Sequence, residues 1–179
     1  MKNKVEWIIL GLLIVGCFLL RVLGQLNIVF IDGQVLFKEV DGWYHMRLAE
    51  NMLTNFPMPL MLDQFNGLNG TWVGFMPFIS WLIAGLGILG LNINLVGAYL
   101  PPIFGSLCLV WVFLIGREVF KKGWPALIAC LLCTLLPSEL FHRSLLGFAD
   151  HHMFEIFLIR GYIFCIIRRE ATNKWRWAV

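Results

Sequence analysis

The run LVGAYLPPIFGSLCLVWVFLI, residues 95–115, decides how this chain folds. It carries no charged side chain, and as a helix it is long enough to cross the roughly 30 Å of hydrocarbon in a bilayer. Over the whole sequence 59% of residues are hydrophobic, 14% are charged and the mean hydropathy is +0.78. Soluble domains contain about 25% charged residues. The composition therefore predicts an all-α integral membrane protein.

Other apolar runs also approach the length of a transmembrane helix. A further stretch, residues 75–91, is apolar but short, and Pro77 and several glycines interrupt it. Proline and glycine both disfavour the interior of a helix, so this stretch is a poor candidate for a complete crossing. The better candidates are residues 7–23, 124–140 and 153–167, in addition to residues 95–115.

The positions of the basic residues predict the number of crossings. Lysine and arginine gather in cytoplasmic loops, and two lysines near the N-terminus place that end in the cytoplasm. The chain that follows the first span, after residue 23, is then outside. The basic cluster in residues 117–122 is cytoplasmic only if an odd number of further spans lies between residue 23 and this cluster. Residues 95–115 alone satisfy this count. We therefore predict four spans, with residues 75–91 forming a helix that lies along the membrane surface or re-enters it, within a long outer loop, residues 24–94.

This topology makes every basic cluster cytoplasmic, including the one formed by Arg168, Arg169, Lys174 and Arg176. It predicts a multi-pass protein of the plasma membrane whose functional face is external or periplasmic. The net charge is only +3, and the basic residues form short clusters beside apolar runs. Such clusters are typical of membrane topology and argue against a nucleic-acid partner.

Two acidic motifs fall on the same outer face in this topology. Asp41 lies in EVDGWYHMR, residues 39–47, and Asp150 begins Asp-His-His, residues 150–152. Carboxylate oxygen and imidazole nitrogen suit a divalent ion such as Mn²⁺, and Asp150 and His152 are close enough in sequence to reach one ion. The alternatives are a solvated loop carboxylate for Asp41 and a helix cap for Asp150. Arg143 either snorkels or binds a phosphate.

At these residues the chain resembles the catalytic subunit of oligosaccharyltransferase, the asparagine-linked glycosylation enzyme, especially its archaeal and bacterial versions. DGWYHMR at residues 41–47, with ENM and NFP following, looks like the first acidic motif of that family. Arg143-Ser144, Gly147, Asp-His-His at residues 150–152 and Glu155 look like the second. The order and separation of the motifs also match.

The resemblance implies the N-terminal region of a polytopic C-type glycosyltransferase, with surface-lying helices in the first outer loop. It implies a Mn²⁺ or Mg²⁺ ion held by the positions matching Asp41, Asp150 and His152, with Asp41 also acting catalytically on the acceptor amide. Arg143, His45 and His151 are further candidates for binding the substrate phosphate. The implied donor is a polyprenyl-linked oligosaccharide, and the implied acceptor is a polypeptide containing Asn-x-Ser/Thr.

Members of the family are several times longer than this chain and end in a soluble domain with a Trp-Trp-Asp-Tyr-Gly motif, which is absent here. We therefore expect these residues to hold most of a metal site and to be inactive alone. Other interpretations are a related enzyme such as a protein O-mannosyltransferase, or a non-catalytic remnant. A transporter that uses Glu155 and Arg160 is disfavoured, because the other polar groups gather at one surface instead of the bilayer midplane.

Overall fold

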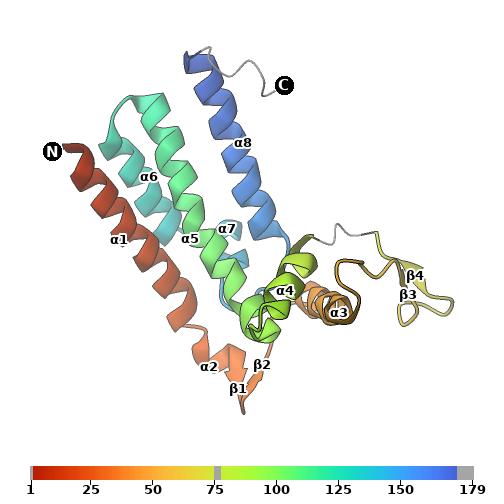
Figure 1. The fold of residues 1–179 in the computed structure, drawn as a ribbon. Coiled ribbons are helices and arrows are strands. Elements are labelled where there is room, and N and C mark those ends of the chain that lie inside the picture. Colours follow the sequence, from red (N-terminus) through yellow and green to blue (C-terminus); the bar gives the residue numbers. More distant parts are fainter. Residues whose placement is uncertain (1, 75–77, 173–179) are drawn as a thin grey trace. The chain divides into compact units, whose positions relative to one another are not determined.

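The computed structural model describes residues 2–74 and 78–172, which are mostly helical and form two compact units (Figure 1). Unit 1 comprises Met1–Gln25, Pro102–Leu145 and His152–Val179, and unit 2 comprises Leu26–Pro101 and Leu146–His151. Pro77 and the predicted cytoplasmic residues Lys174 and Arg176 lie outside the described residues. The elements of unit 1 are α1 (Lys2–Leu23), most of α5 (Ile93–Phe120), α6 (Gly123–Leu135), α7 (Glu139–Arg143) and α8 (His152–Thr172).

The core of unit 1 lies where α1, α5 and α6 pack side by side (Figure 1). A β-carbon on Gly116 of α5 would lie 2.7 Å from the Cβ of Ala126 on α6. These small residues let the two helix backbones approach closely, as small residues do between membrane helices. The buried side chains of the core are Leu10, Cys17, Leu109, Phe113, Ala126, Leu127 and Cys130.

Aromatic side chains join α8 to α5. The ring of Trp111 on α5 lies 5.7 Å from that of Phe157 and 5.8 Å from that of Phe164, both on α8. Gly161 makes room for this indole, since a β-carbon there would lie 3.2 Å from the Trp111 ring. Aromatic rings bury large apolar areas and add a preference for particular ring geometries, so this contact fixes α8 against α5.

Each of the four predicted spans overlaps a helix, although the span 124–140 extends beyond the end of α6, and the helices differ in length and polarity. Two, Lys4–Leu23 and Ile93–Phe120, are long and apolar enough to cross a membrane. α6 ends at Leu135, because Pro137 disfavours the helical conformation of the residue before it, and Leu136 is extended (ψ 129°). α8 contains several arginines, which make it more polar than α1 or α5. Membrane crossing by α6 and α8, and hence the count of four, stays a prediction.

A buried arginine ties the end of α1 to the residues that follow α7. Arg21 is fully buried; its Nε donates to Ser144 Oγ at 2.6 Å, and its Nη1 donates to the Cys17 carbonyl at 3.2 Å. Its guanidinium also lies over the ring of Phe141, 5.0 Å from the centroid. Buried charges are costly unless hydrogen bonds satisfy them, so Arg21 fixes the position of Ser144 within unit 1.

Unit 2 contains the region predicted as an outer loop. Its first hairpin turns at Asp32 and Gly33, both with positive φ (50° and 76°), as an Asp-Gly hairpin turn requires. α3 packs against α4. The helix predicted within residues 75–91 is confirmed for Phe78–Ile88, which forms α4. The elements are α2 (Leu26–Val29), β1 (Phe30–Ile31), β2 (Gln34–Val35), α3 (Val40–Asn55), β3 (Leu62–Asp63), β4 (Thr71–Trp72) and α4 (Phe78–Ile88).

Residues 146–151 belong to unit 2 although they come late in the sequence. Pro102 has no N–H to donate to the Ala98 carbonyl one turn earlier in α5, and this carbonyl accepts from the Gly147 N–H instead, at 3.1 Å. The Gly147 carbonyl in turn accepts from Lys38 N at 3.1 Å. Leu146, Phe148 and Ala149 are buried around these bonds. Both backbone groups of Gly147 therefore hold the segment in unit 2.

Gly147 is the residue at which this segment is most easily disrupted. Its φ is +80°, and a β-carbon would lie 2.7 Å from Val29 Cγ2. Gly147→Ala should lower the free energy of unfolding by about 2–4 kcal/mol, through left-handed backbone strain and overpacking together. Gly33→Ala is the control, since φ is +76° there and nothing lies within 4 Å. Thermal unfolding in detergent measures both; equal losses would show that packing around Gly147 is unimportant.

Candidate metal centre

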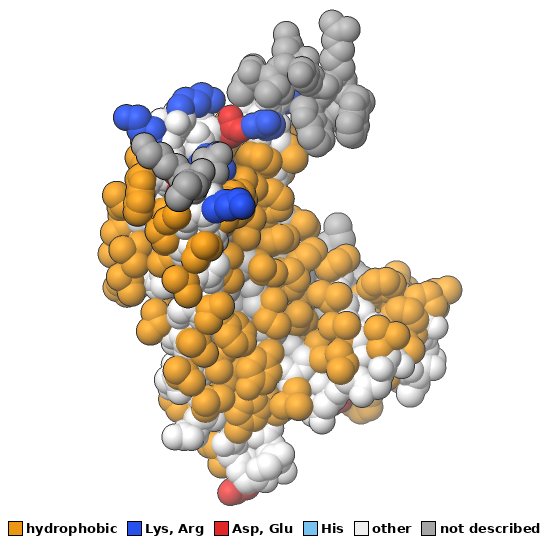
Figure 2. Space-filling model, turned by 60° about the vertical axis from the view of Figure 1, so that its left-hand side comes forward, with side chains coloured by type: hydrophobic (Ala, Val, Ile, Leu, Met, Phe, Trp, Pro, Cys, Tyr) orange, Lys and Arg blue, Asp and Glu red, His pale blue; other side chains and the backbone are white. Residues whose placement is uncertain are grey.

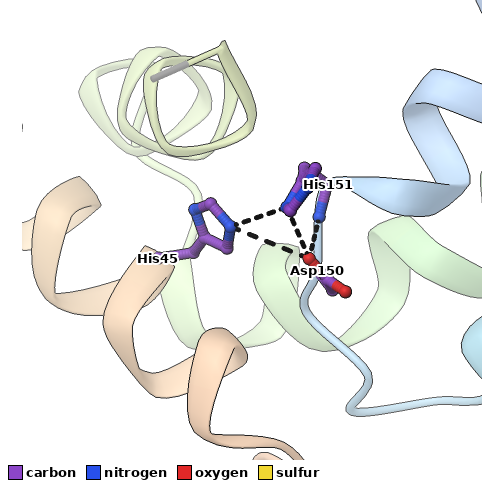
Figure 3. A group of neighbouring side chains, drawn as sticks. All are labelled: His45, Asp150 and His151. Carbon is purple, nitrogen blue, oxygen red and sulfur yellow. Dashed lines mark hydrogen bonds and ion pairs between the residues drawn. The ribbon is translucent and has the colours of Figure 1, made fainter. Parts of the chain in front are cut away.

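Two histidines and one aspartate converge in unit 2 (Figure 3). His45 projects from α3, whereas Asp150 and His151 come from the segment that Gly147 anchors. His45 Nε2 lies 3.2 Å from His151 Nδ1 and 3.8 Å from Asp150 Oδ1. His151 Nδ1 lies 2.6 Å from the same Asp150 oxygen. Three potential ligand atoms from two distant sequence motifs therefore face one another.

Two side chains of the cluster are buried and the third is partly exposed. The side chains of His45 and Asp150 are 2% and 3% exposed, whereas that of His151 is 25% exposed. A carboxylate taken out of water needs hydrogen bonds or a cation. Asp150 Oδ1 accepts from the His151 backbone N–H at 2.6 Å. His151 is therefore the member of the cluster that solvent reaches most easily.

The helix periodicity of α3 and a serine on α4 fix the orientation of the His45 ring. His45, Ala49 and Met52 are spaced three to four residues apart and therefore lie on one side of α3, and all three are buried. His45 Nδ1 lies 3.2 Å from Ser80 Oγ, and Ser80 is fully buried. When the Nδ1 proton is donated to Ser80, Nε2 carries the lone pair, which faces the cluster and could bind a metal. Ser80 would thus be the hydrogen-bond acceptor that commonly orients the ring of a metal-binding histidine.

The spacing of the three ligand atoms fits a divalent ion. Donors about 2.1 Å from one ion lie roughly 3.0–3.4 Å apart in octahedral or tetrahedral geometry. The distances between the atoms are 3.2, 3.8 and 2.6 Å, so small side-chain adjustments place all three around one ion. Two imidazoles with one carboxylate suit zinc, manganese or iron, whereas Mg²⁺ prefers oxygen ligands.

The cluster contains only some of the residues predicted from the sequence. Asp150 is a member, and so are His45 and His151, which were predicted to bind substrate phosphate. Asp41 is not a member; it lies exposed in the first turn of α3, four residues before His45 and hence on the same side of the helix. The assignment of Asp41 as a ligand and a catalytic group therefore stays a prediction.

Two other predicted residues lie in unit 1. His152 begins α8, and its Nδ1 lies 3.4 Å from Glu155 Oε2 one turn later. Arg143 ends α7, where its Nε donates to Glu139 Oε2 at 3.0 Å. Metal binding by His152 and phosphate binding by Arg143 stay predictions. Sequence reasoning missed Ser80, although a lone hydroxyl within the apolar run Phe78–Ile88 is a signal that a buried polar partner exists.

Comparison with known proteins identifies a family for nearly the whole chain. The model of the N-terminal region of the oligosaccharyl transferase STT3 family matches residues 12–179. Dolichyl-phosphooligosaccharide-protein glycotransferase 3 of Archaeoglobus fulgidus is 35% identical over 189 residues, which cover 98% of this chain and 21% of the relative. The chain thus spans about a fifth of the length of this relative.

Solved structures agree with the sequence comparison. The oligosaccharyltransferase AglB of A. fulgidus, in complex with an inhibitory peptide and a dolichol-phosphate, is 32% identical with a TM-score of 0.87, covering 99% of this chain and 21% of that one. A complex of the A. fulgidus oligosaccharyltransferase with Zn and sulfate is 33% identical with a TM-score of 0.83, covering 95% and 22%.

The part assigned to Ser80 can be tested by metal binding. Ser80→Ala removes the acceptor for His45 Nδ1 and should weaken Mn²⁺ or Zn²⁺ binding by about 10–100-fold, the usual effect of losing such a partner. Titration calorimetry on the purified chain measures this. Ser106→Ala is the matched control, because Ser106 is also buried but bonds the Pro102 carbonyl in α5. Equal affinity in the Ser80→Ala and unaltered proteins would show that Ser80 does not orient His45 for metal binding.

Proposed function

Because this chain belongs to the oligosaccharyl transferase STT3 family, we propose that it forms the metal-binding part of an enzyme that glycosylates asparagine. The donor is a glycan on a polyprenyl phosphate or pyrophosphate, and the acceptor is the asparagine of an Asn-x-Ser/Thr sequence. The observation that carries this proposal is the approach of His45 to Asp150 and His151, which joins the two acidic motifs in one cluster.

The residues of the cluster suit the chemistry of a leaving phosphate. A bound divalent ion supplies positive charge to the phosphate oxygens that depart with the lipid carrier. Asp150 is the anionic ligand that would hold such an ion, and His45 and His151 add neutral donors, so these three residues by themselves leave a divalent ion with one positive charge. Burial of His45 and Asp150 excludes water from one side, which strengthens these electrostatic interactions.

We assign Asp150 as the central ligand, and His45 and His151 as its neighbours in the cluster. Asp41, one turn before His45 on the same side of α3, is proposed as a further ligand and as the group that engages the acceptor amide. His152 is proposed to complete the coordination, and Arg143 to bind the donor phosphate. Mn²⁺ fits these mixed ligands better than Mg²⁺.

The similar solved structures support the choice of substrates. One solved relative holds a dolichol-phosphate and an inhibitory peptide, and another holds Zn and sulfate. A lipid phosphate, a peptide and a divalent ion are the three components that the proposed reaction requires. The site is proposed to face the outside of the plasma membrane, with the N-terminus in the cytoplasm. Residues 1–179 alone are expected to bind metal without transferring glycan.

Loss of the central ligand should abolish the reaction. The test uses a full-length enzyme that contains this chain. Asp150→Asn should lower its metal-dependent glycosylation of an Asn-x-Thr peptide at least about 100-fold, because an amide replaces the charged ligand of the cluster. Mass spectrometry of the peptide measures the product. The control Asp32→Asn makes the same change in an exposed turn with positive φ, which asparagine tolerates.

A peptide with glutamine in place of asparagine should remain unmodified, and transfer to its threonine would support an O-glycosylating enzyme instead. Transfer that is unaffected by Asp150→Asn would contradict the proposal.

The ligand set can be determined with four variants of the purified chain. His45→Ala and His151→Ala should each weaken Mn²⁺ binding about tenfold or more in calorimetry, since each removes one donor from the cluster. Asp41→Asn and His152→Ala test the two ligands that come from the sequence. If only the second pair weakens binding, the histidine cluster orients the loop and does not hold the ion.

A further inference from the structure

A second candidate site lies in unit 1, where α5 ends and α6 begins. A cavity of about 990 Å³ opens there between side chains of α1, α5, α6 and α8. Figure 2 shows Lys and Arg side chains gathered at one end, above a flank of hydrophobic side chains. The basic residues lining the cavity are Arg117, Lys121, Lys122 and Arg168, and its apolar wall includes Leu114, Trp124 and Phe164.

The lining carries excess positive charge. Glu118 pairs with Lys121 at 3.3 Å and also with Arg168. The second acid of the lining, Glu6, is buried against Gly123 at the N-terminus of α6, where a carboxylate is favoured by the helix dipole. Among the residues that the structure describes, Arg117 and Lys122 form no ion pair with a carboxylate. The four basic residues that line the cavity therefore outnumber its two acidic residues, Glu6 and Glu118.

The backbone at this turn is strained at a lysine that lines the cavity. Lys121 has φ 54°, a left-handed conformation that costs a residue with a β-carbon free energy and that glycine adopts without penalty. The side chain of Lys121 is 68% exposed, so packing does not require it. Strain at an exposed basic residue beside a cavity points to a use for the charge.

We propose that this cavity binds the headgroup of an anionic phospholipid. The phosphodiester would lie between Arg117 and Lys122, and the acyl chains would run along Leu114, Phe164 and Trp124 toward the exposed apolar flank of unit 1. The positive-inside count places this end in the cytoplasmic leaflet, where basic pockets between membrane helices bind anionic lipid headgroups. A free phosphate would use the cations but not the apolar wall. The proposal does not depend on glycan transfer or on the metal centre.

Lipid retention tests this assignment. The chain is reconstituted with equal amounts of phosphatidylglycerol and phosphatidylcholine of identical acyl chains, extracted in mild detergent and weighed by native mass spectrometry. Phosphatidylglycerol should be retained selectively, and Lys122→Gln should reduce its retention about fivefold, as expected for one basic residue at a headgroup. Lys4→Gln is the control, because Lys4 is an exposed lysine of α1 that does not line the cavity.

Lys121→Gly separates binding from folding. Glycine relieves the strained φ, so the thermal unfolding midpoint should stay the same or rise while phosphatidylglycerol retention falls. Excess inorganic phosphate should not displace the lipid. Equal retention of the two lipids, equal effects of Lys122→Gln and Lys4→Gln, or displacement by inorganic phosphate would each overturn the proposal, the last in favour of a site for free phosphate.

Discussion

The candidate metal centre depends on one hydrogen bond, from the Gly147 N–H to the Ala98 carbonyl, at 3.1 Å. That carbonyl is available because Pro102, four residues later in α5, has no N–H to offer it. Gly147 can use it because its φ of +80° and its missing β-carbon allow the backbone to approach Val29. Asp150 and His151, three and four residues later, are thereby held beside His45 of α3.

Two of the buried polar side chains in the described structure connect separate elements. Arg21 joins α1 to Ser144 in unit 1, and Ser80 joins α4 to His45 in unit 2. In an apolar environment an unpaired polar group is expensive, so such bonds select one arrangement among many that pack equally well. Stability comes mainly from apolar contacts, whereas these polar contacts decide which side chains meet.

The two candidate sites use charge in opposite ways. The candidate metal centre brings one carboxylate and two imidazoles together in a largely buried cluster, which favours a cation. The cavity at the α5–α6 turn presents more cations than its acids neutralise, which favours an anion. Because the first lies in unit 2 and the second in unit 1, variants of one can serve as controls for the other. Glycan transfer and lipid retention are therefore separable measurements.

The sequence by itself indicated the helical membrane character and the family and pointed to Asp150 as a candidate ligand, because apolar runs, charge positions and the residues within each motif can be read without knowing how distant segments pack. It also predicted helices at all four candidate spans and within residues 75–91, although α6 ends earlier than expected because of Pro137. Only the tertiary structure decided that His45 and His151 meet Asp150 and that Ser80 orients His45. These contacts join residues up to 106 positions apart, and they depend on the backbone geometry of Gly147 and the packing of α3 against α4. Sequence spacing contains no information on either, because both arise when distant segments pack together.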